Sequence, residues 1–333
     1  MRKIRIGILG ATGAVGREMR TILEERDFPA EELRLMASAK SAGLRLPFHG
    51  EALSVIETSE SAFSGLDLVL GAASREVAQS LAPAIKASGA VFIDNSSAFR
   101  LDPTVPLVVP EINPQDVHSH HGIVANPNCT TVITLVAIHS LLKESPAESI
   151  VASSYQAVSG AGAGGPAELL EETEAVAEGR EYAPRVFPRP IAYNVIPQIG
   201  KAEYAGYTSE EMKLQNEGRR ILHLPQLKAC CTCVRVPVIR SHSVSVTLRT
   251  KESIAVQRAR ELIAAAPGCR LADDLDSGRY PTPLEASDQD LVYVGRIRRD
   301  LTDERGLCLW CCGDQLRKGA ATNAVQIAEL LSI

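Results

Sequence analysis

Cys129 is the residue of this chain best placed for covalent chemistry. It follows Asn126-Pro-Asn128 and precedes Thr130-Thr-Val-Ile133, which opens a predicted helix. The unpaired amides of a helix N-terminus stabilise a thiolate, so we expect the pKa of this thiol to lie below that of free cysteine. The alternative is a buried cysteine that only begins the helix.

His242 is the best candidate for proton transfer. Val244, Val246 and Leu248 alternate with polar residues in the segment 243–250, as in a strand with one buried face. Extending this period of two backwards places His242 on the inward face. Such an imidazole could exchange protons with a thiol or with an intermediate. A core histidine with satisfied hydrogen bonds is the alternative.

Charged side chains near a predicted helix could recognise a substrate. Thr208-Ser-Glu-Glu211 is a capping box, and the helical repeat then places Glu210, Lys213 and Glu217 along the edge of the buried face. A solvated, salt-bridged face is the alternative. The side chains best suited to bind an anion are Arg100, Lys213 and Arg235.

Three glycines predict a dinucleotide site. Gly10, Gly13 and Gly16 lie between a predicted strand, 4–9, and a predicted helix, 15–25. Glycines permit a tight turn there, and the helix N-terminus attracts a diphosphate. The spacing is G-x-x-G-x-x-G, and a plain strand-to-helix turn is the alternative.

The end of the next predicted strand, 33–37, indicates which dinucleotide is bound. An NAD site usually has an acid there to hold the ribose 2′-hydroxyl. This chain instead has Ser38, Lys40 and Ser41, which suit a 2′-phosphate. The sequence therefore favours NADP over NAD.

Strands and helices alternate over the first 130 residues, which predicts a parallel sheet covered by helices. Longer strands at 148–157 and within 232–250, with helices at 166–179 and 208–222, predict a second, mixed domain. We expect a Rossmann-type domain of residues 1–128 with 312–333, completed by the C-terminal helix 320–331. We expect residues 129–311 to form a mixed α+β domain.

Composition excludes several classes of protein. The 333 residues carry a net charge of −5 and only 4% aromatic residues, which argues against a nucleic-acid partner. No apolar run reaches the ~18 residues of a membrane helix. The N-terminus shows no signal-peptide pattern, so we expect a reducing, cytoplasmic location.

The remaining cysteines and histidines do not predict a metal site. Cys230, Cys231, Cys233, Cys308, Cys311 and Cys312 cluster within apolar, strand-like runs. We interpret them as small core residues, with zinc or redox chemistry as the alternative. The segment His118-Ser-His-His121 is interpreted as a solvated loop.

A nicotinamide site and a nucleophilic cysteine together indicate one kind of reaction. A cysteine that attacks an acyl group forms a thioester, which hydride reduces to an aldehyde; the reverse reaction makes an acyl phosphate from an aldehyde and phosphate. Both directions need a histidine and a cationic pocket.

The whole set of motifs resembles aspartate-β-semialdehyde dehydrogenase. The resemblance covers nearly the whole chain and rests on Gly10-Ala-Thr-Gly-Ala-Val-Gly16, Asp94-Asn-Ser-Ser-Ala-Phe-Arg100, Asn126-Pro-Asn-Cys129, Tyr155-Gln-Ala-Val-Ser-Gly-Ala-Gly162, Glu210-Glu-Met-Lys213, Arg235-Val-Pro-Val-Ile-Arg-Ser-His242 and Arg317-Lys-Gly-Ala-Ala-Thr-Asn323.

The resemblance implies a role for each matching residue. Cys129 would form the thioester, His242 would be the acid/base and Gln156 would orient the intermediate. The other roles are phosphate binding for Arg100, Lys213 and Asn128, carboxylate binding for Arg235 and ammonium binding for Glu210. The NADP site would include Gly10, Thr12, Gly13, Ala14, Val15, Ser38, Lys40, Ser41, Ser159, Gly160 and Asn323.

The implied reaction is the NADPH-dependent conversion of L-4-aspartyl phosphate to L-aspartate 4-semialdehyde, in lysine, threonine and methionine synthesis. The implied assembly is a homodimer or homotetramer, with residues 129–311 as the catalytic and dimerisation domain. Two departures from the family's pattern are Lys40, where arginine is common, and Gly71-Ala-Ala-Ser74, where Ser-Ala-Gly-Gly is expected.

Three other functions were weighed. N-acetyl-γ-glutamyl-phosphate reductase shares the chemistry, but it typically has glycine where this chain has Asn128, and an acetylated amine would have no use for Glu210. Glyceraldehyde-3-phosphate dehydrogenase matches only around Cys129. A non-catalytic NADP-binding redox sensor would instead depend on Cys231 or Cys312.

Overall fold

The computed structural model describes residues 4–331, which fall into two compact units. Unit 1 extends to Asn128 and resumes at Gly319, and unit 2 is Cys129–Lys318. The sequence predicted that the chain returns to the first domain at residue 312. That boundary was wrong, because Cys312 and Gly313 complete a strand that pairs within unit 2.

Unit 1 is built on a seven-stranded sheet in the order β3-β4-β2-β1-β5-β6-β7, parallel except for the β3–β4 pair. The strand order reverses beside β1, which is where open α/β sheets bind nucleotides. Its strands are β1 (Ile4–Leu9), β2 (Ala30–Ala37), β3 (Arg45–Phe48), β4 (Glu51–Glu57), β5 (Leu68–Gly71), β6 (Val91–Asp94) and β7 (Ile123–Ala125).

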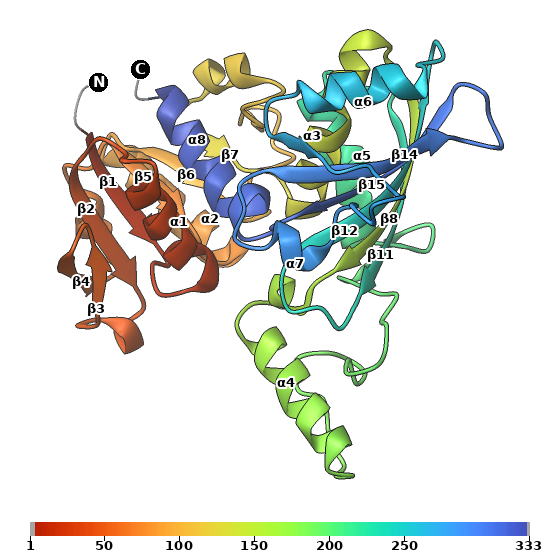
Figure 1. Cartoon of the computed structure of the whole chain (residues 1–333). Coiled ribbons are helices and arrows are strands. Elements are labelled where there is room, and N and C mark those ends of the chain that lie inside the picture. The colour runs from red at the N-terminus through yellow and green to blue at the C-terminus, as the bar shows by residue number, and fades with distance from the viewer. Residues whose placement is uncertain (1–3, 332–333) are drawn as a thin grey trace. The chain divides into compact units, whose positions relative to one another are not determined.

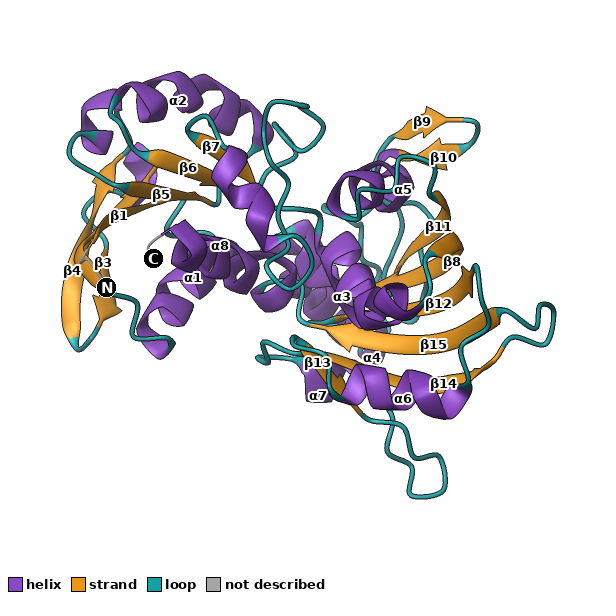
Figure 2. Cartoon of the chain, turned by 90° about the horizontal axis from the view of Figure 1, so that it is seen from above, coloured by secondary structure: helices purple, strands orange, loops and turns teal. Residues whose placement is uncertain are grey.

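Three helices cover this sheet. Helix α2 (Arg75–Ala87) lies on one face, while α1 (Ala14–Glu25) and α8 (Thr322–Leu331) lie on the other (Figure 2). Helix α1 turns Met19, Ile22 and Leu23 inward at helical spacing. Helix α8 packs against α1, which confirms the expected return of the C-terminal helix. These elements form a Rossmann-type domain.

Unit 2 is built on a six-stranded mixed sheet in the order β11-β8-β12-β15-β14-β13 (Figure 2). The β11–β8 and β13–β14 pairs are parallel and the others are antiparallel, so the sheet is mixed, as the sequence predicted. Its strands are β8 (Ala147–Gln156), β11 (Lys228–Arg235), β12 (His242–Thr250), β13 (Cys269–Leu271), β14 (Val292–Arg299) and β15 (Gly306–Gly313), beside the small pair β9 (Ala202–Tyr204) and β10 (Tyr207–Thr208).

Helix α3 (Cys129–Glu144) is the central helix of unit 2. Its residues from Thr130 to Leu141 are all buried, because its apolar side chains are spread around the helix and it packs against β12, β14 and β15. Helix α4 (Gly164–Ala177) projects away from the sheet (Figure 1). The other helices are α5 (Ser209–Ile221), α6 (Val256–Ala264) and α7 (Pro283–Ala286).

Within residues 4–331, no helix has both the length and the apolar character to cross a membrane.

Candidate active site

Three strand ends form one edge of the unit 2 sheet. The parallel strands β8 and β11 end in register at Gln156 and Arg235. Strand β12 runs antiparallel to β8, so its first residue, His242, lies at the same edge. The amide of Ala157, the next residue after β8, confirms this placement by donating to the His242 ring. Strand order therefore brings together side chains that are far apart in the sequence.

Cys129 is the first residue of α3 and is half-buried. It interacts electrostatically with Arg235, which is 6% exposed. Burial lowers the pKa of Arg235, and a negative charge on Cys129 opposes that shift. A thiolate at this position therefore has both a helix N-terminus and a guanidinium nearby.

His242 lies on the inward face and is fully buried, as the alternation predicted. Its Nδ1 accepts the Ala157 N–H at 3.1 Å, so the neutral ring carries its hydrogen on Nε2. Nε2 has no hydrogen-bond partner among the described residues. Burial, and secondly the charge of Arg235, lowers the pKa of His242 to about 3. The ring is therefore a neutral donor with one open position, unlike a satisfied core histidine.

Gln156 is held by residues from two helices. Its Nε2 donates to Thr130 Oγ1 at 2.8 Å and lies 3.3 Å from Glu210 Oε1. Glu210 Oε2 in turn pairs with Lys213 Nζ at 2.6 Å, and both stand on α5, which begins with the predicted capping box. The Glu210 side chain is only 10% exposed, so this stripe is not a solvated face.

Gly160 lies directly against the two groups at this edge. A Cβ on Gly160 would stand 2.8 Å from Arg235 Nη1 and 3.1 Å from His242 Cε1, so a larger residue would displace both side chains. The neighbouring Ser159 Oγ accepts a hydrogen bond from Gln315 Nε2 at 2.5 Å. The sequence analysis did not identify Gln315, and no local pattern marks it.

Unit 1 contains the other predicted anion ligands. Arg100 is buried, and its guanidinium donates to the carbonyls of Asn126 at 2.8 Å and Asn95 at 2.6 Å. These bonds fix the guanidinium beside the segment that leads to Asn128, which is 5% exposed and precedes Cys129 in the chain. Asn323 is fully buried and donates to Asn126 Oδ1 at 2.6 Å.

The turn after β1 fits a dinucleotide diphosphate. Gly10 has a φ of +83°, and a Cβ there would lie 2.6 Å from the Ala72 carbonyl oxygen, so only glycine is accommodated. No side chain caps α1 and its first turn holds no acid, which leaves amides for an anion. Thr12 Oγ1 lies 3.3 Å from Ser41 Oγ, so Ser38, Lys40 and Ser41 stand beside this turn.

The clustered cysteines are mainly core residues, as predicted. Cys231, Cys233, Cys311 and Cys312 are buried and Cys308 is half-buried, whereas Cys230 is exposed and contradicts that interpretation. All eight cysteines lie in the described segment and none forms a disulfide there. The hydrogen bond with Cys233 and burial raise the pKa of Cys231, and burial raises that of Cys312 to about 11. These shifts leave both thiols protonated and weakly nucleophilic.

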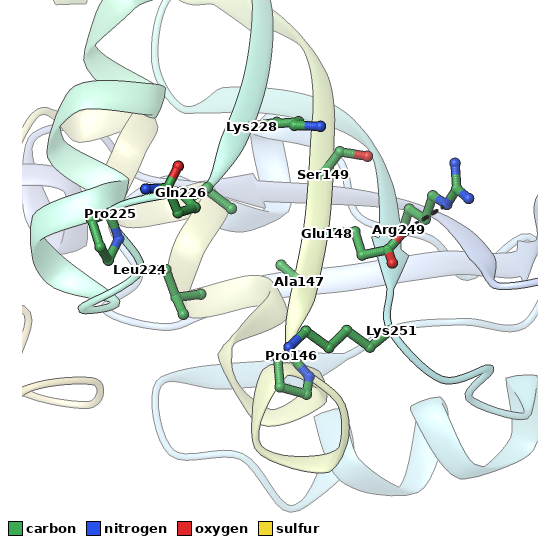
Figure 3. A pocket seen from close by; sticks show the side chains of 11 residues that line it. Pro146, Ala147, Glu148, Ser149, Leu224, Pro225, Gln226, Lys228, Arg249 and Lys251 are labelled. Atoms are coloured by element: carbon green, nitrogen blue, oxygen red, sulfur yellow. Dashed lines mark ion pairs between the residues drawn. The ribbon is translucent and has the colours of Figure 1, made fainter.

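A cavity of about 650 Å³ lies at the opposite end of β8 from Gln156 (Figure 3). Its lining includes Pro146, Glu148, Lys228, Arg249 and Lys251, with Arg249 paired to Glu148 at 3.1 Å. None of the predicted site residues lines it. Over the described range, no group of three His, Cys, Asp or Glu side chains has the arrangement of a metal site.

Comparisons with known proteins agree with this architecture. Two family models match: "Semialdehyde dehydrogenase, NAD binding domain" over residues 5–120 and "Semialdehyde dehydrogenase, dimerisation domain" over 138–318. The aspartate-semialdehyde dehydrogenase of Synechocystis sp. is 48% identical, covering 98% of this chain and 97% of that protein. The Bacillus subtilis enzyme of the same name is 43% identical, covering 99% and 98%.

A solved structure gives the same result. Aspartate semialdehyde dehydrogenase II from Vibrio cholerae, complexed with ASA, superposes with a TM-score of 0.97 at 39% identity, over 100% of this chain and 99% of that one. These findings confirm the resemblance drawn from the motifs and do not favour the acetylglutamyl alternative. The chain belongs to the aspartate-semialdehyde dehydrogenase family of oxidoreductases.

Proposed function

We propose that this chain catalyses the reversible, NADPH-dependent conversion of L-4-aspartyl phosphate to L-aspartate 4-semialdehyde and phosphate, for lysine, threonine and methionine synthesis. One observation carries the proposal. One edge of the unit 2 sheet presents a buried arginine, Arg235, and an imidazole with an open Nε2, His242. The Glu210 carboxylate of α5 lies 3.3 Å from Gln156 at this edge, and Cys129 interacts with Arg235. The Vibrio relative of the same fold is complexed with ASA.

Cys129 is the proposed nucleophile. Its thiolate attacks the acyl carbon of the substrate, the phosphate leaves, and a thioester remains on the sulfur. When bound, NADPH would supply the hydride for the reduction of this thioester. For His242 we propose a narrower role than the implied acid/base: its Nε2–H hydrogen-bonds the substrate oxygen while that oxygen carries negative charge. Breakage of the carbon–sulfur bond then releases the aldehyde and restores the Cys129 thiolate.

The charged side chains match the substrate group by group. Arg235 is proposed to hold the α-carboxylate and Glu210 the α-ammonium, while Gln156 orients the thioester. Arg100, Lys213 and Asn128 are proposed to bind phosphate. Because Glu210 and Lys213 pair in this structure, substrate binding must exchange one contact for two. The substrate ammonium replaces Lys213 as the ion-pair partner of Glu210, and the substrate phosphate becomes the new partner of Lys213.

NADP is the proposed cofactor. Gly10, Gly13, Ala14 and Val15 would present backbone amides to the diphosphate, and Thr12 would line the same turn. Ser38, Lys40 and Ser41 would bind the 2′-phosphate, and Ser159 and Gly160 the nicotinamide end. Asn323 is fully buried and would act by holding Asn126.

Ser38→Asp tests the proposed 2′-phosphate site. A carboxylate at this position repels a 2′-phosphate and suits a 2′-hydroxyl, so the KM for NADPH should rise by on the order of tenfold or more, while that for NADH does not rise. Initial rates with both cofactors measure this. Ser80→Asp, an exposed serine on α2, is the matched control. Equal KM changes for both cofactors would contradict the assignment.

The choice of substrate is tested with two aldehydes. Purified protein should reduce NADP in a phosphate-dependent reaction with aspartate semialdehyde and not with N-acetylglutamate semialdehyde. The physical reason is that Glu210 offers a carboxylate to a free ammonium, and an acetylated amine carries no charge to pair with it. Activity with only the acetylated aldehyde would overturn the proposed substrate.

Unit 2 is proposed to form the contacts of a homodimer or homotetramer. Helices α3, α5 and α6 contact the unit 2 sheet, whereas side chains from the other face, Val151 and Tyr155, are exposed. Tyr155 also packs on Trp310, with ring centroids 5.3 Å apart. We propose that this exposed face packs against a second copy, in keeping with the dimerisation family model.

A further inference from the structure

Ser241, the residue directly before His242, has a backbone conformation that serine rarely adopts. Its φ is +72°, in the left-handed region that glycine enters freely and that other residues avoid. Ser241 is fully buried, so this is not a mobile surface turn. A conformation that is locally unfavourable persists only where the surrounding contacts enforce it.

Two side chains enforce the conformation of Ser241. Its backbone N–H donates to Gln315 Oε1 at 2.8 Å, and its Oγ lies 2.9 Å from Ser287 Oγ. Gln315 is only 3% exposed, and its own Nε2 donates to Ser159 Oγ at 2.5 Å. Both Oε1 and Nε2 of Gln315 are therefore hydrogen-bonded, so the oxygen that accepts the Ser241 N–H is held in place.

Arg240, the residue before Ser241, is also held by the segment that follows β15. Arg240 Nε donates to Asp314 Oδ2 at 2.6 Å, and that oxygen also accepts the Asp288 N–H at 2.8 Å. Asp314 is fully buried. Asp314 and Gln315 follow Gly313, the last residue of β15, which pairs with His242. The end of β15 thus holds both residues that lead into His242.

We propose that Ser241, held by its hydrogen bonds with Gln315 and Ser287, is a positioning residue for His242. The left-handed turn sets the direction in which β12 starts, so that Nδ1 of the ring meets the Ala157 N–H and Nε2 faces the substrate. This inference rests on the proposed role of His242. The ring itself has one protein hydrogen bond at Nδ1, so its orientation depends on where the backbone places it.

The test compares Ser241→Ala with Ser241→Gly. Both variants lose the hydroxyl contact with Ser287, but glycine adopts the left-handed conformation without strain and alanine does not. We expect kcat of the alanine variant to lie on the order of tenfold below that of the glycine variant, with the KM for NADP equal in the two. Equal kcat values for the two variants would overturn the proposal.

A second readout is independent of the reaction. The ¹⁵N NMR signals of His242 can be observed in protein with ¹⁵N-labelled histidine and assigned by their loss in His242→Gln. They should show an unprotonated Nδ1 and a protonated Nε2 between pH 5 and 9. The glycine variant should keep this pattern and the alanine variant should lose it. An unchanged pattern in the alanine variant would contradict the positioning role, even if the proposed substrate proves wrong.

Asp27 provides a matched control for backbone strain. It has a φ of +46° and is exposed on unit 1. Asp27→Ala and Asp27→Gly should differ in melting temperature in the same direction as the Ser241 pair. They should not differ in kcat or in the His242 signals. A kcat difference within the Asp27 pair would show that strain acts through global stability, which would overturn the specific role of Ser241.

Discussion

Cys129→Ala is expected to abolish phosphate-dependent NADP reduction with aspartate semialdehyde, lowering kcat by on the order of 10⁴-fold or more. Without the sulfur no thioester forms, and no other described thiol shares the setting of Cys129 at a helix N-terminus beside Arg235. The measurement is kcat from initial rates, together with NADP binding by the variant. NADP binding should persist, because the glycine turn lies in unit 1.

Cys231→Ala and Cys312→Ala are the matched controls for this prediction. Both thiols are buried and held protonated by pKa values well above that of free cysteine. Their loss leaves small cavities and should lower stability by about 1 kcal/mol while leaving kcat within about twofold. Retained activity in Cys129→Ala, with activity lost in either control, would contradict the assignment of Cys129 as the nucleophile.

His242→Ala is expected to lower kcat by on the order of 10²- to 10⁴-fold. The loss follows from the open Nε2, because that atom provides the only N–H of the neutral ring that can reach a substrate oxygen. His242→Gln retains an N–H donor at a similar reach and should lose less. If glutamine and alanine lower kcat equally, hydrogen-bond donation by Nε2 is not the function of the ring.

The buried ring also predicts how stability depends on pH. The pKa of His242 is about 3 in the folded chain and about 6.5 when unfolded, so the unfolded chain binds one more proton between these values. The contribution of the neutral His242 ring to the free energy of unfolding is fully present above pH 6.5. It is lost as the pH falls, by up to about 1.4 kcal/mol per pH unit.

Denaturant titrations of wild type and His242→Gln at pH 5 and pH 7 measure this dependence. The wild type should lose more unfolding free energy than the variant between the two pH values, because only the wild type has the buried imidazole. An equal loss in both proteins would mean that His242 is protonated in the folded chain.

Much of this protein could be predicted from local sequence patterns. The glycine turn after Leu9, the capping box at Thr208 and the inward direction of His242 are each decided by neighbours within a few residues. Such features follow from backbone geometry and from the period of a helix or a strand. The same patterns gave the Rossmann-type domain and a second domain with a mixed sheet.

Other features could not be predicted locally. The hairpin of β3 and β4 was missed because both strands are mostly exposed and each buries a single side chain, Phe48 and Val55, so little apolar surface marks them. The domain boundary at residue 312 was wrong because the pairing of β15 with β12 is a long-range choice of partner. The exposure of Cys230 depends on which face of β11 is covered, and its type and neighbours do not reveal that.

The sequence by itself determined the chemistry available to this protein: a thiol at a helix start, an imidazole on a strand and a turn for a diphosphate. Only the tertiary structure decided that Gln156, Arg235 and His242 share one sheet edge, and that Gly160 and Ser241 shape the surroundings of the imidazole. The physical reason is that residue type and period act over a few positions along the chain. Strand order and register instead join positions far apart, through the packing of the whole domain.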